Sequence, residues 1–334
     1  VTMFRSILGG LLWLTATRLD LIAEVCALQS QVTRAKVAHL RQANGVVKRA
    51  RQEVGQGMGL YFQKLRPPLR LACVHDSSAA GNTRHYAQEG ILVLLCEDHM
   101  DQFSREHEHI LTDDQCKALG GRCHILWSHG AKTKRISYST SHAETLAAVS
   151  GLEAGTLVSV RLAELLYSPR PPTLQGLIAQ QERGVRDLPI DAYTDCRDFY
   201  ELASGDKNAP QDKNQHLYVL SFREARMSGR VRWMCLTPTE SMTADALTKT
   251  MIAEPMMKLL TTGTVQFYNQ EKHKMVIRSL PVMSEIEEHH FDMDDKELIR
   301  ELSKPVHVSI LIGYDDIGDI DILVFLFGDF RWLR

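Results

Sequence analysis

The order of the apolar segments between residues 69 and 251 is the strongest constraint on the fold. The expected elements, in order, are strands at 69–76, 91–96 and 123–128, a long helix from residue 141, a strand at 190–194, helices at 197–203 and 216–227, a strand at 231–236 and a helix at 243–251. Residues 134–137 extend or follow the third strand. Sequential strands with short links usually pair as an antiparallel meander. The order therefore predicts an α/β fold with a mixed five-stranded sheet flanked by helices.

A helical, basic segment is expected ahead of the sheet, over residues 1–66. Leucines, Ile22 and Val25 keep helical spacing across 6–30. Basic side chains dominate residues 33–70, where Glu53 is the single acid; they are Arg34, Lys36, Arg41, Lys48, Arg49, Arg51, Lys64, Arg66 and Arg70. A solvated helix face and a surface that contacts phosphates both fit this pattern. The pair Pro67-Pro68 then marks a boundary.

Composition excludes several classes of protein. The 334 residues include 39 Lys+Arg and 41 Asp+Glu, so the chain is not highly basic, and nucleic-acid affinity must come from local patches or bound cations. Seven cysteines without a C-x-x-C pair argue against a disulfide framework and favour a reducing, intracellular compartment over secretion. The N-terminal apolar run 7–14 is too short to span a membrane, and no membrane partner is expected.

Four carboxylates occupy positions from which the fold could gather them. Asp76 ends the first strand, Glu144 lies in the first turn of the long helix, Asp195 ends the fourth strand, and Asp245 begins the last helix. Strand ends and helix starts near the centre of a sheet are places where side chains converge. Four acids at one point repel and need cations. Mg²⁺ prefers oxygen ligands, and two such ions are the usual apparatus for attack on a phosphodiester.

Each of these acids also has a purely structural interpretation. Glu144 can complete a capping box with Ser141. Asp245 can be a first-turn acid that the helix dipole favours, and Asp76 can start a turn. Asp195 has two neighbouring competitors, Asp191 and Asp198. The set as a whole, rather than any single acid, therefore favours a metal centre.

Several longer strings resemble the ribonuclease H region of copia-type LTR retrotransposon polyproteins. The matching stretches are ILWSHGAKTKRISYSTSHAE at 125–144, YTD at 193–195, FRE at 222–224 and LTPTESMTADALTK at 236–249. The string GGLLWLTATRLD at 9–20 resembles the piece that joins reverse transcriptase to ribonuclease H in those polyproteins. The similarity covers roughly residues 5–252. It assigns 1–66 to the reverse transcriptase connection and 67–252 to a ribonuclease-H-like domain, and it leaves 253–334 unassigned.

The resemblance implies a Mg²⁺-dependent endonuclease that cleaves the RNA strand of RNA–DNA hybrids, with two ions and Mn²⁺ as a substitute. Its four acidic ligands map onto Asp76, Glu144, Asp195 and Asp245. The family usually shows Asp-Ala-(Asp/Ser) after the first strand, whereas this chain has Asp76-Ser-Ser. The cations expected to hold the nucleic-acid backbone are Lys132, Lys134 and Arg135, together with Lys48, Arg49 and Arg51 of the basic segment.

Other interpretations of the same residues stay open. One is a catalytically inactive, nucleic-acid-binding remnant of a transposon, and another is a structural connection module beside a reverse transcriptase domain. No small-molecule cofactor is expected. Tyr314-Asp315-Asp316 lacks the residue that a polymerase Tyr-x-Asp-Asp turn requires. A histidine and cysteine group matches no common zinc pattern and is interpreted as a loop; its members are His107, His109, Cys116, Cys123 and His124. The acid-rich run 285–297 and the apolar run 320–332 carry no functional interpretation.

Overall fold

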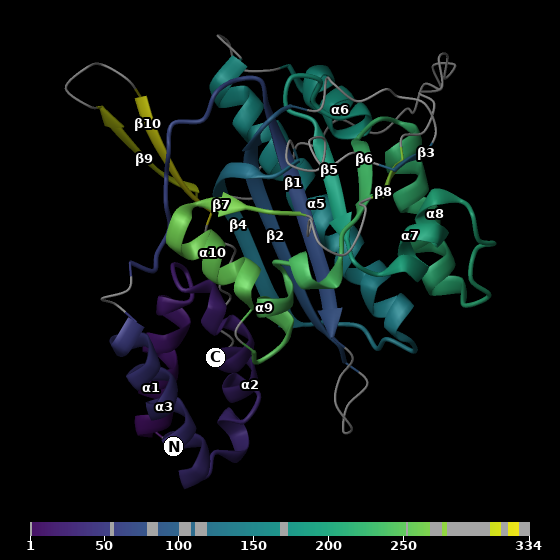
Figure 1. Cartoon of the computed structure of the whole chain (residues 1–334). Coiled ribbons are helices and arrows are strands. Elements are labelled where there is room, and N and C mark those ends of the chain that lie inside the picture. The colour runs from purple at the N-terminus through teal and green to yellow at the C-terminus, as the bar shows by residue number, and fades with distance from the viewer. Residues whose placement is uncertain are drawn as a thin grey trace. The chain divides into compact units, whose positions relative to one another are not determined.

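The computed structural model describes residues 2–53, 57–78, 86–99, 108–110, 119–167, 173–251, 253–267, 276–278, 308–314 and 320–326. The chain divides into two compact units, Val1–Val282 and Met283–Arg334. Figure 1 shows the course of the chain.

A mixed sheet is the centre of the first unit (Figure 1). Its long strands are β1 (Leu69–Ser78), β2 (Gln88–Glu97), β4 (Gly121–Lys132), β5 (Ile190–Thr194) and β6 (Val231–Leu236). Three short strands, β3 (Glu108–Ile110), β7 (Thr264–Val265) and β8 (Val276–Arg278), complete the order β3-β8-β6-β5-β1-β2-β4-β7 within the described residues. β1, β2 and β4 form the predicted antiparallel meander, and β5 and β6 run parallel to β1.

The predicted α/β class, with a mixed sheet flanked by helices, is confirmed. Several strand boundaries differ from the prediction, and β2 and β4 both extend beyond the predicted 91–96 and 123–128. The first strand continues past Asp76 to Ser78, and residues 134–137 lie outside any strand. The sheet also gains its short edge strands from segments too brief for a recognisable apolar pattern.

Helices cover both faces of this sheet. One face carries α5 (Thr140–Tyr167), α7 (Arg197–Ser204) and α8 (Lys213–Met227), and the other carries α9 (Asp245–Thr248) and α10 (Glu254–Thr262). A further helix that the sequence did not predict, α6 (Leu174–Arg183), packs against α5. Strand alternation separates the two cores, because Ala192 and Met234 belong to one while Tyr193 and Trp233 belong to the other.

Helix α5 lies close against β1 because of a glycine. A Cβ on Gly155 would collide with the Sγ atom of Cys73, which is buried in β1. This close approach sets the depth at which the first turn of α5 meets the sheet. By length and composition alone α5 could cross a membrane; in the structure it packs against β1, β2 and β5.

Three helices precede the sheet: α1 (Thr2–Leu14), α2 (Ile22–Gln29) and α3 (Val37–Glu53). The single helix predicted over 6–30 is wrong, because the chain breaks after α1. The hydroxyl of Thr15 donates to the carbonyl of Leu12 at 2.7 Å, and Arg18 pairs with Asp20 at 2.8 Å and with Glu53. A side chain that bonds its own backbone and an ion pair to a distant helix together favour the break.

The sheet domain continues beyond residue 252. Met256 and Leu260 of α10, together with Val265 and Phe267, belong to the same core cluster as Leu92 of β2. Part of the segment left unassigned by the sequence is therefore built into the sheet's core.

In the second unit, β9 (Val308–Tyr314) and β10 (Ile320–Leu326) pair as an antiparallel hairpin. Tyr314 closes β9, whereas Asp315 and Asp316 lie outside the described residues. The acid-rich run 285–297 and residues 327–332 of the apolar run lie outside them as well.

Candidate metal centre

The first predicted acid, Asp76, lies inside β1 with 2% of its surface exposed. The interpretation of Asp76 as a turn starter is therefore wrong. Thr248 of α9 donates its hydroxyl to Asp76 Oδ2, while the next residue, Ser77, contacts α5. Because successive strand residues point to opposite faces, β1 presents a carboxylate to one helical layer and a hydroxyl to the other.

The second acid, Glu144, reaches the sheet from the second turn of α5, which begins at Thr140, and not from the first turn as the sequence predicted. Its Oε1 accepts from the backbone N–H of Ser77 at 3.1 Å and from the Ser77 hydroxyl at 2.9 Å. The capping-box interpretation is wrong, because Ser139 is the residue whose hydroxyl accepts from the first turn, at the N–H of His142. Within the described part of the chain, Glu144 Oε2 is buried and has no hydrogen-bond partner. A buried acceptor without a donor is costly and is the kind of atom that a cation would satisfy.

The third acid, Asp195, follows the last residue of β5. Because β5 runs parallel to β1, its end reaches the same edge of the sheet as Asp76. One carboxylate oxygen each from Asp76, Glu144 and Asp195 lies within 4.8 Å of the others. These three residues, here called the three-carboxylate cluster, lie close enough to bind a metal ion. Oxygen donors of this kind suit hard divalent cations.

The fourth predicted acid, Asp245, begins α9 and is buried, but it is not part of the three-carboxylate cluster. Lys249, one turn further on, holds its Nζ 2.5 Å from Asp245 Oδ1 and 3.8 Å from Asp76 Oδ2. The sequence prediction did not include Lys249. The signal was present, because an acid and a lysine four residues apart in a helix are neighbours.

Burial dominates the electrostatics of the cluster. It raises the pKa of Asp76 to about 7, with a further contribution from the charge of Asp245. It raises the pKa of Glu144 to about 9, with the charge of Asp76 adding to the effect. The pKa of Asp195 is raised by burial as well. Carboxylates whose charged forms are disfavoured in this way gain most from a bound cation.

Without a bound ion, the free energy of unfolding is expected to fall as the pH rises from about 6.5 to about 9. The unfolded chain has already lost the protons of Asp76 and Glu144 at their ordinary pKa values of 3.8 and 4.5, whereas the folded chain keeps them up to about 7 and about 9. The folded state thus binds more protons, and stability declines with pH. Buried His75, whose pKa is lowered from 6.5 to about 3, is neutral in both states above about pH 6.5 and does not oppose this trend.

Thermal denaturation in a chelator at several pH values measures this slope. Glu144→Gln should flatten it, and Glu153→Gln, an exposed position on the same helix, should leave it unchanged. Equal slopes in the wild-type protein and Glu144→Gln would show that Glu144 does not hold a proton in the folded state.

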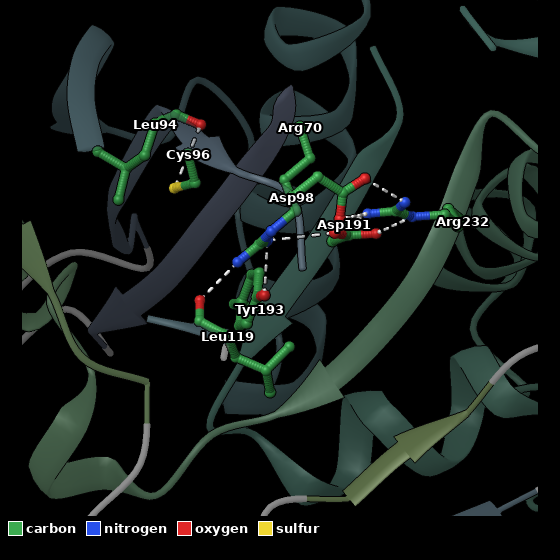
Figure 2. Close-up of polar contacts among 8 residues, drawn as sticks. All are labelled: Arg70, Leu94, Cys96, Asp98, Leu119, Asp191, Tyr193 and Arg232. Atoms are coloured by element: carbon green, nitrogen blue, oxygen red, sulfur yellow. Dashed lines mark hydrogen bonds and ion pairs between the residues drawn. The ribbon is translucent and has the colours of Figure 1, made fainter. Parts of the chain in front are cut away.

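The competitor Asp191 has a different role. It is fully buried at the opposite end of β5, between two guanidinium groups (Figure 2). Arg70 Nη1 donates to Asp191 Oδ2 at 3.1 Å, and Arg232 donates to both Asp191 oxygens at 2.8 and 3.0 Å. Arg232 also binds Asp98 at 2.7 Å. The charge of Asp191 is therefore already balanced, unlike that of the three-carboxylate cluster.

The other competitor, Asp198, is an exposed surface residue paired with Lys207 at 2.5 Å. Asp195 is thus the member of this group of three acids that reaches the cluster.

The predicted nucleic-acid cations fall into two groups. Lys132 at the end of β4, with Lys134 and Arg135 just after it, is exposed, and the Arg135 guanidinium lies 5.0 Å from the ring centre of Tyr218. On α3, Lys48 and Arg51 are exposed, but both terminal nitrogens of Arg49 bind Glu24, at 2.5 and 3.0 Å; the charge of Arg49 is already neutralised.

The group considered for zinc does not assemble within the described part of the chain. Cys123 lies opposite Cys96 across the β2–β4 pair, and His124 Nε2 accepts from the backbone of Gln63 at 3.0 Å. His107 and Cys116 lie outside the described residues. All cysteines that the structure describes are free thiols.

Comparison with protein-family models, with curated proteins and with solved structures gives no match for this chain. The candidate metal centre is therefore defined by the geometry of the chain itself.

Proposed function

We propose that this protein is a divalent-metal-dependent ribonuclease that cleaves the RNA strand of RNA–DNA hybrids. The observation that carries the proposal is the convergence of Asp76, Glu144 and Asp195 from three separate elements into one largely buried cluster. These acids are far apart along the chain: Asp76 lies in β1, Glu144 in α5, and Asp195 directly after β5. Convergence of this kind is unfavourable without a cation, since burial raises the pKa of Asp76 and of Glu144 and the charge of a neighbouring acid raises each further.

The topology supports a ribonuclease-H-like fold. The apolar pattern of the sequence predicted three strands in a meander, a long helix, and two further strands separated by helices. The five long strands and α5 follow this order, and the cluster lies where β1, β5 and the start of α5 meet. Sheet edges at which parallel strands end are common places for active sites.

The residues of the cluster have distinct tasks in this proposal. Asp76, Glu144 and Asp195 would hold Mg²⁺, or Mn²⁺ in its place, with Asp245 next to them on α9. A pair of bound ions supplies the Lewis acidity for attack of water on the phosphodiester. Ser77 orients Glu144 through two hydrogen bonds to the same oxygen, which leaves the other oxygen for a cation.

The substrate class comes from the resemblance and is consistent with the surface charge. Lys132, Lys134 and Arg135 are exposed shortly before α5 begins, and Glu144 is in the second turn of that helix. Exposed cations of this type contact phosphates without reading bases. Discrimination of RNA from DNA would then depend on the 2′-hydroxyl and groove shape.

The test is incubation of the full chain with an end-labelled RNA–DNA hybrid and Mg²⁺. We expect RNA fragments with 5′-phosphate and 3′-hydroxyl ends, no cutting of the DNA strand, and loss of activity in a chelator. Single-stranded RNA and duplex DNA of the same sequence are the matched controls. Salt-sensitive binding of the hybrid without any cleavage would contradict the proposal and favour the nucleic-acid-binding remnant.

A further inference from the structure

Lys249 is the cation closest to the acids of the candidate metal centre in the described residues. Its Nζ lies 2.5 Å from Asp245 Oδ1 and 3.8 Å from Asp76 Oδ2. One ammonium group therefore lies between an acid of α9 and an acid of β1. It occupies the kind of position, between carboxylate oxygens, that a metal ion would also take.

The backbone of Lys249 is held by a hydrogen bond, while its side chain is accessible to solvent. The backbone N–H of Lys249 donates to the carbonyl of Asp245 at 2.9 Å, which fixes the end of α9. The side chain is 38% exposed, whereas that of Asp76 is 3% exposed. A lysine head group on a flexible stem can leave such a place for solvent without moving the backbone.

The contacts also explain why Asp245 is missing from the three-carboxylate cluster. Its Oδ1 is held by Lys249, and its charge acts on Asp76 and Asp195 only from a distance. Thr248, the neighbour of Lys249, holds Asp76 through its hydroxyl. The end of α9 thus engages both acids with its own side chains.

We propose that Lys249 is a positioning residue that serves as an internal counter-ion of the metal-free site. Its ammonium neutralises Asp245 until a divalent ion binds, and the ion displaces it and frees Asp245 to join the other three carboxylates. This inference rests on the proposed function. Displacement is favourable because a divalent ion brings twice the charge into direct contact with the oxygens. The released ammonium stays close to the centre because its backbone is fixed, and there it can form an ion pair with a substrate phosphate.

The test measures the affinity for Mn²⁺ by isothermal titration calorimetry with MnCl₂ alone. It compares the wild-type protein with Lys249→Met, Lys249→Arg and the control Lys213→Met. Lys213 is exposed at the start of α8, outside the metal centre. Removal of a competing cation should tighten Mn²⁺ binding, and we expect Lys249→Met to bind about tenfold more tightly than the wild-type protein, a modest value for a partly exposed charge. Lys249→Arg, which keeps the cation, and Lys213→Met should both bind as the wild type does.

A double variant makes the test specific for Asp245. In the background of Asp245→Asn, the carboxylate that Lys249 holds at 2.5 Å is gone and only the 3.8 Å contact with Asp76 remains, so Lys249→Met should tighten Mn²⁺ binding by a smaller factor than in the wild-type background. Circular dichroism and melting temperature establish that each variant is folded.

The outcomes separate this inference from the proposed function. Wild-type binding that Lys249→Met leaves unchanged or weakens would overturn the counter-ion role while the metal centre stands. If Lys249→Met binds Mn²⁺ and the wild-type protein does not, the result would support the counter-ion role of Lys249 strongly. If neither the wild-type protein nor any variant binds Mn²⁺, both the inference and the proposed metal centre fail.

Discussion

Asp195→Asn is expected to lower the rate of hybrid cleavage by about a hundredfold or more, because metal polarisation is worth several kcal/mol and each ~1.4 kcal/mol is tenfold in rate. The substitution keeps the size of the side chain but removes the charge with which Asp195 would hold an ion. Binding of the hybrid should persist, since the exposed cations are untouched. The measurements are single-turnover cleavage and hybrid affinity at the same ionic strength.

The control for this variant lies at the other end of the same strand. Asp187 is exposed just before β5, so Asp187→Asn should cut at the wild-type rate. Asp195→Asn should also be no less stable than the wild-type protein, because burial already raises the pKa of Asp195 and disfavours its charge. Normal cleavage by a folded Asp195→Asn protein would remove this residue from the metal centre.

Asp191→Asn is expected to lower the free energy of unfolding by about 3–5 kcal/mol, the usual cost of removing one partner of a buried ion pair. Asp191 and Arg70 are both fully buried, and the acceptors that Arg70 would keep, among them the Tyr193 hydroxyl at 2.8 Å and the Leu119 carbonyl at 2.5 Å, are uncharged (Figure 2). A buried guanidinium without its carboxylate has no compensating charge. Arg232 would keep Asp98, and its partial exposure reduces its share of the loss.

Urea denaturation at neutral pH measures this effect, again with Asp187→Asn as the control. The cost is a large part of the roughly 5–15 kcal/mol by which domains are stable. The protein that remains folded should still cleave the hybrid, because Asp191 lies at the end of β5 away from the cluster. A stability within experimental error of the wild type would mean that the two arginines do not depend on Asp191.

The long strands could be predicted from the sequence because each contains a short, mainly apolar segment, of which Ile91–Cys96 in β2 is a continuous apolar run. Helix α5 could be predicted because its apolar residues keep helical spacing over most of its length. The chain order of these elements then led to the correct fold class. Element ends were less accurate: the end of β1 depends on pairing with Gln88–Gly90 of β2, which local composition does not reveal.

The candidate site was predictable only as a set of acids. Asp191 and Asp195 are the same residue type, four positions apart, and nothing local separates their roles. What distinguishes Asp191 is contact with Arg70, 121 positions away, and with Arg232, 41 positions away. Such pairs are set by strand register, and register is a property of the whole sheet.

Glu144 illustrates the same limit in a helix. Its spacing from Ser141 fits a local cap, and local rules favoured that interpretation. In the fold, its carboxylate instead bonds Ser77, 67 positions away. Lys249 shows the reverse case, since a local spacing rule would have paired it with Asp245 had the chain been searched for bases as well as acids.

The alternation of side chains along β1 has a consequence for the dynamics of the helices when the centre holds an ion. Asp76 reaches toward α9 and Ser77 toward α5, so the cluster is joined to helices on opposite faces of the sheet. An ion bound there would connect the two helical layers through the sheet. Binding of an ion should therefore slow amide hydrogen exchange in both α5 and α9, which otherwise belong to separate cores. Removal of the ion should raise the exchange rate in both helices together.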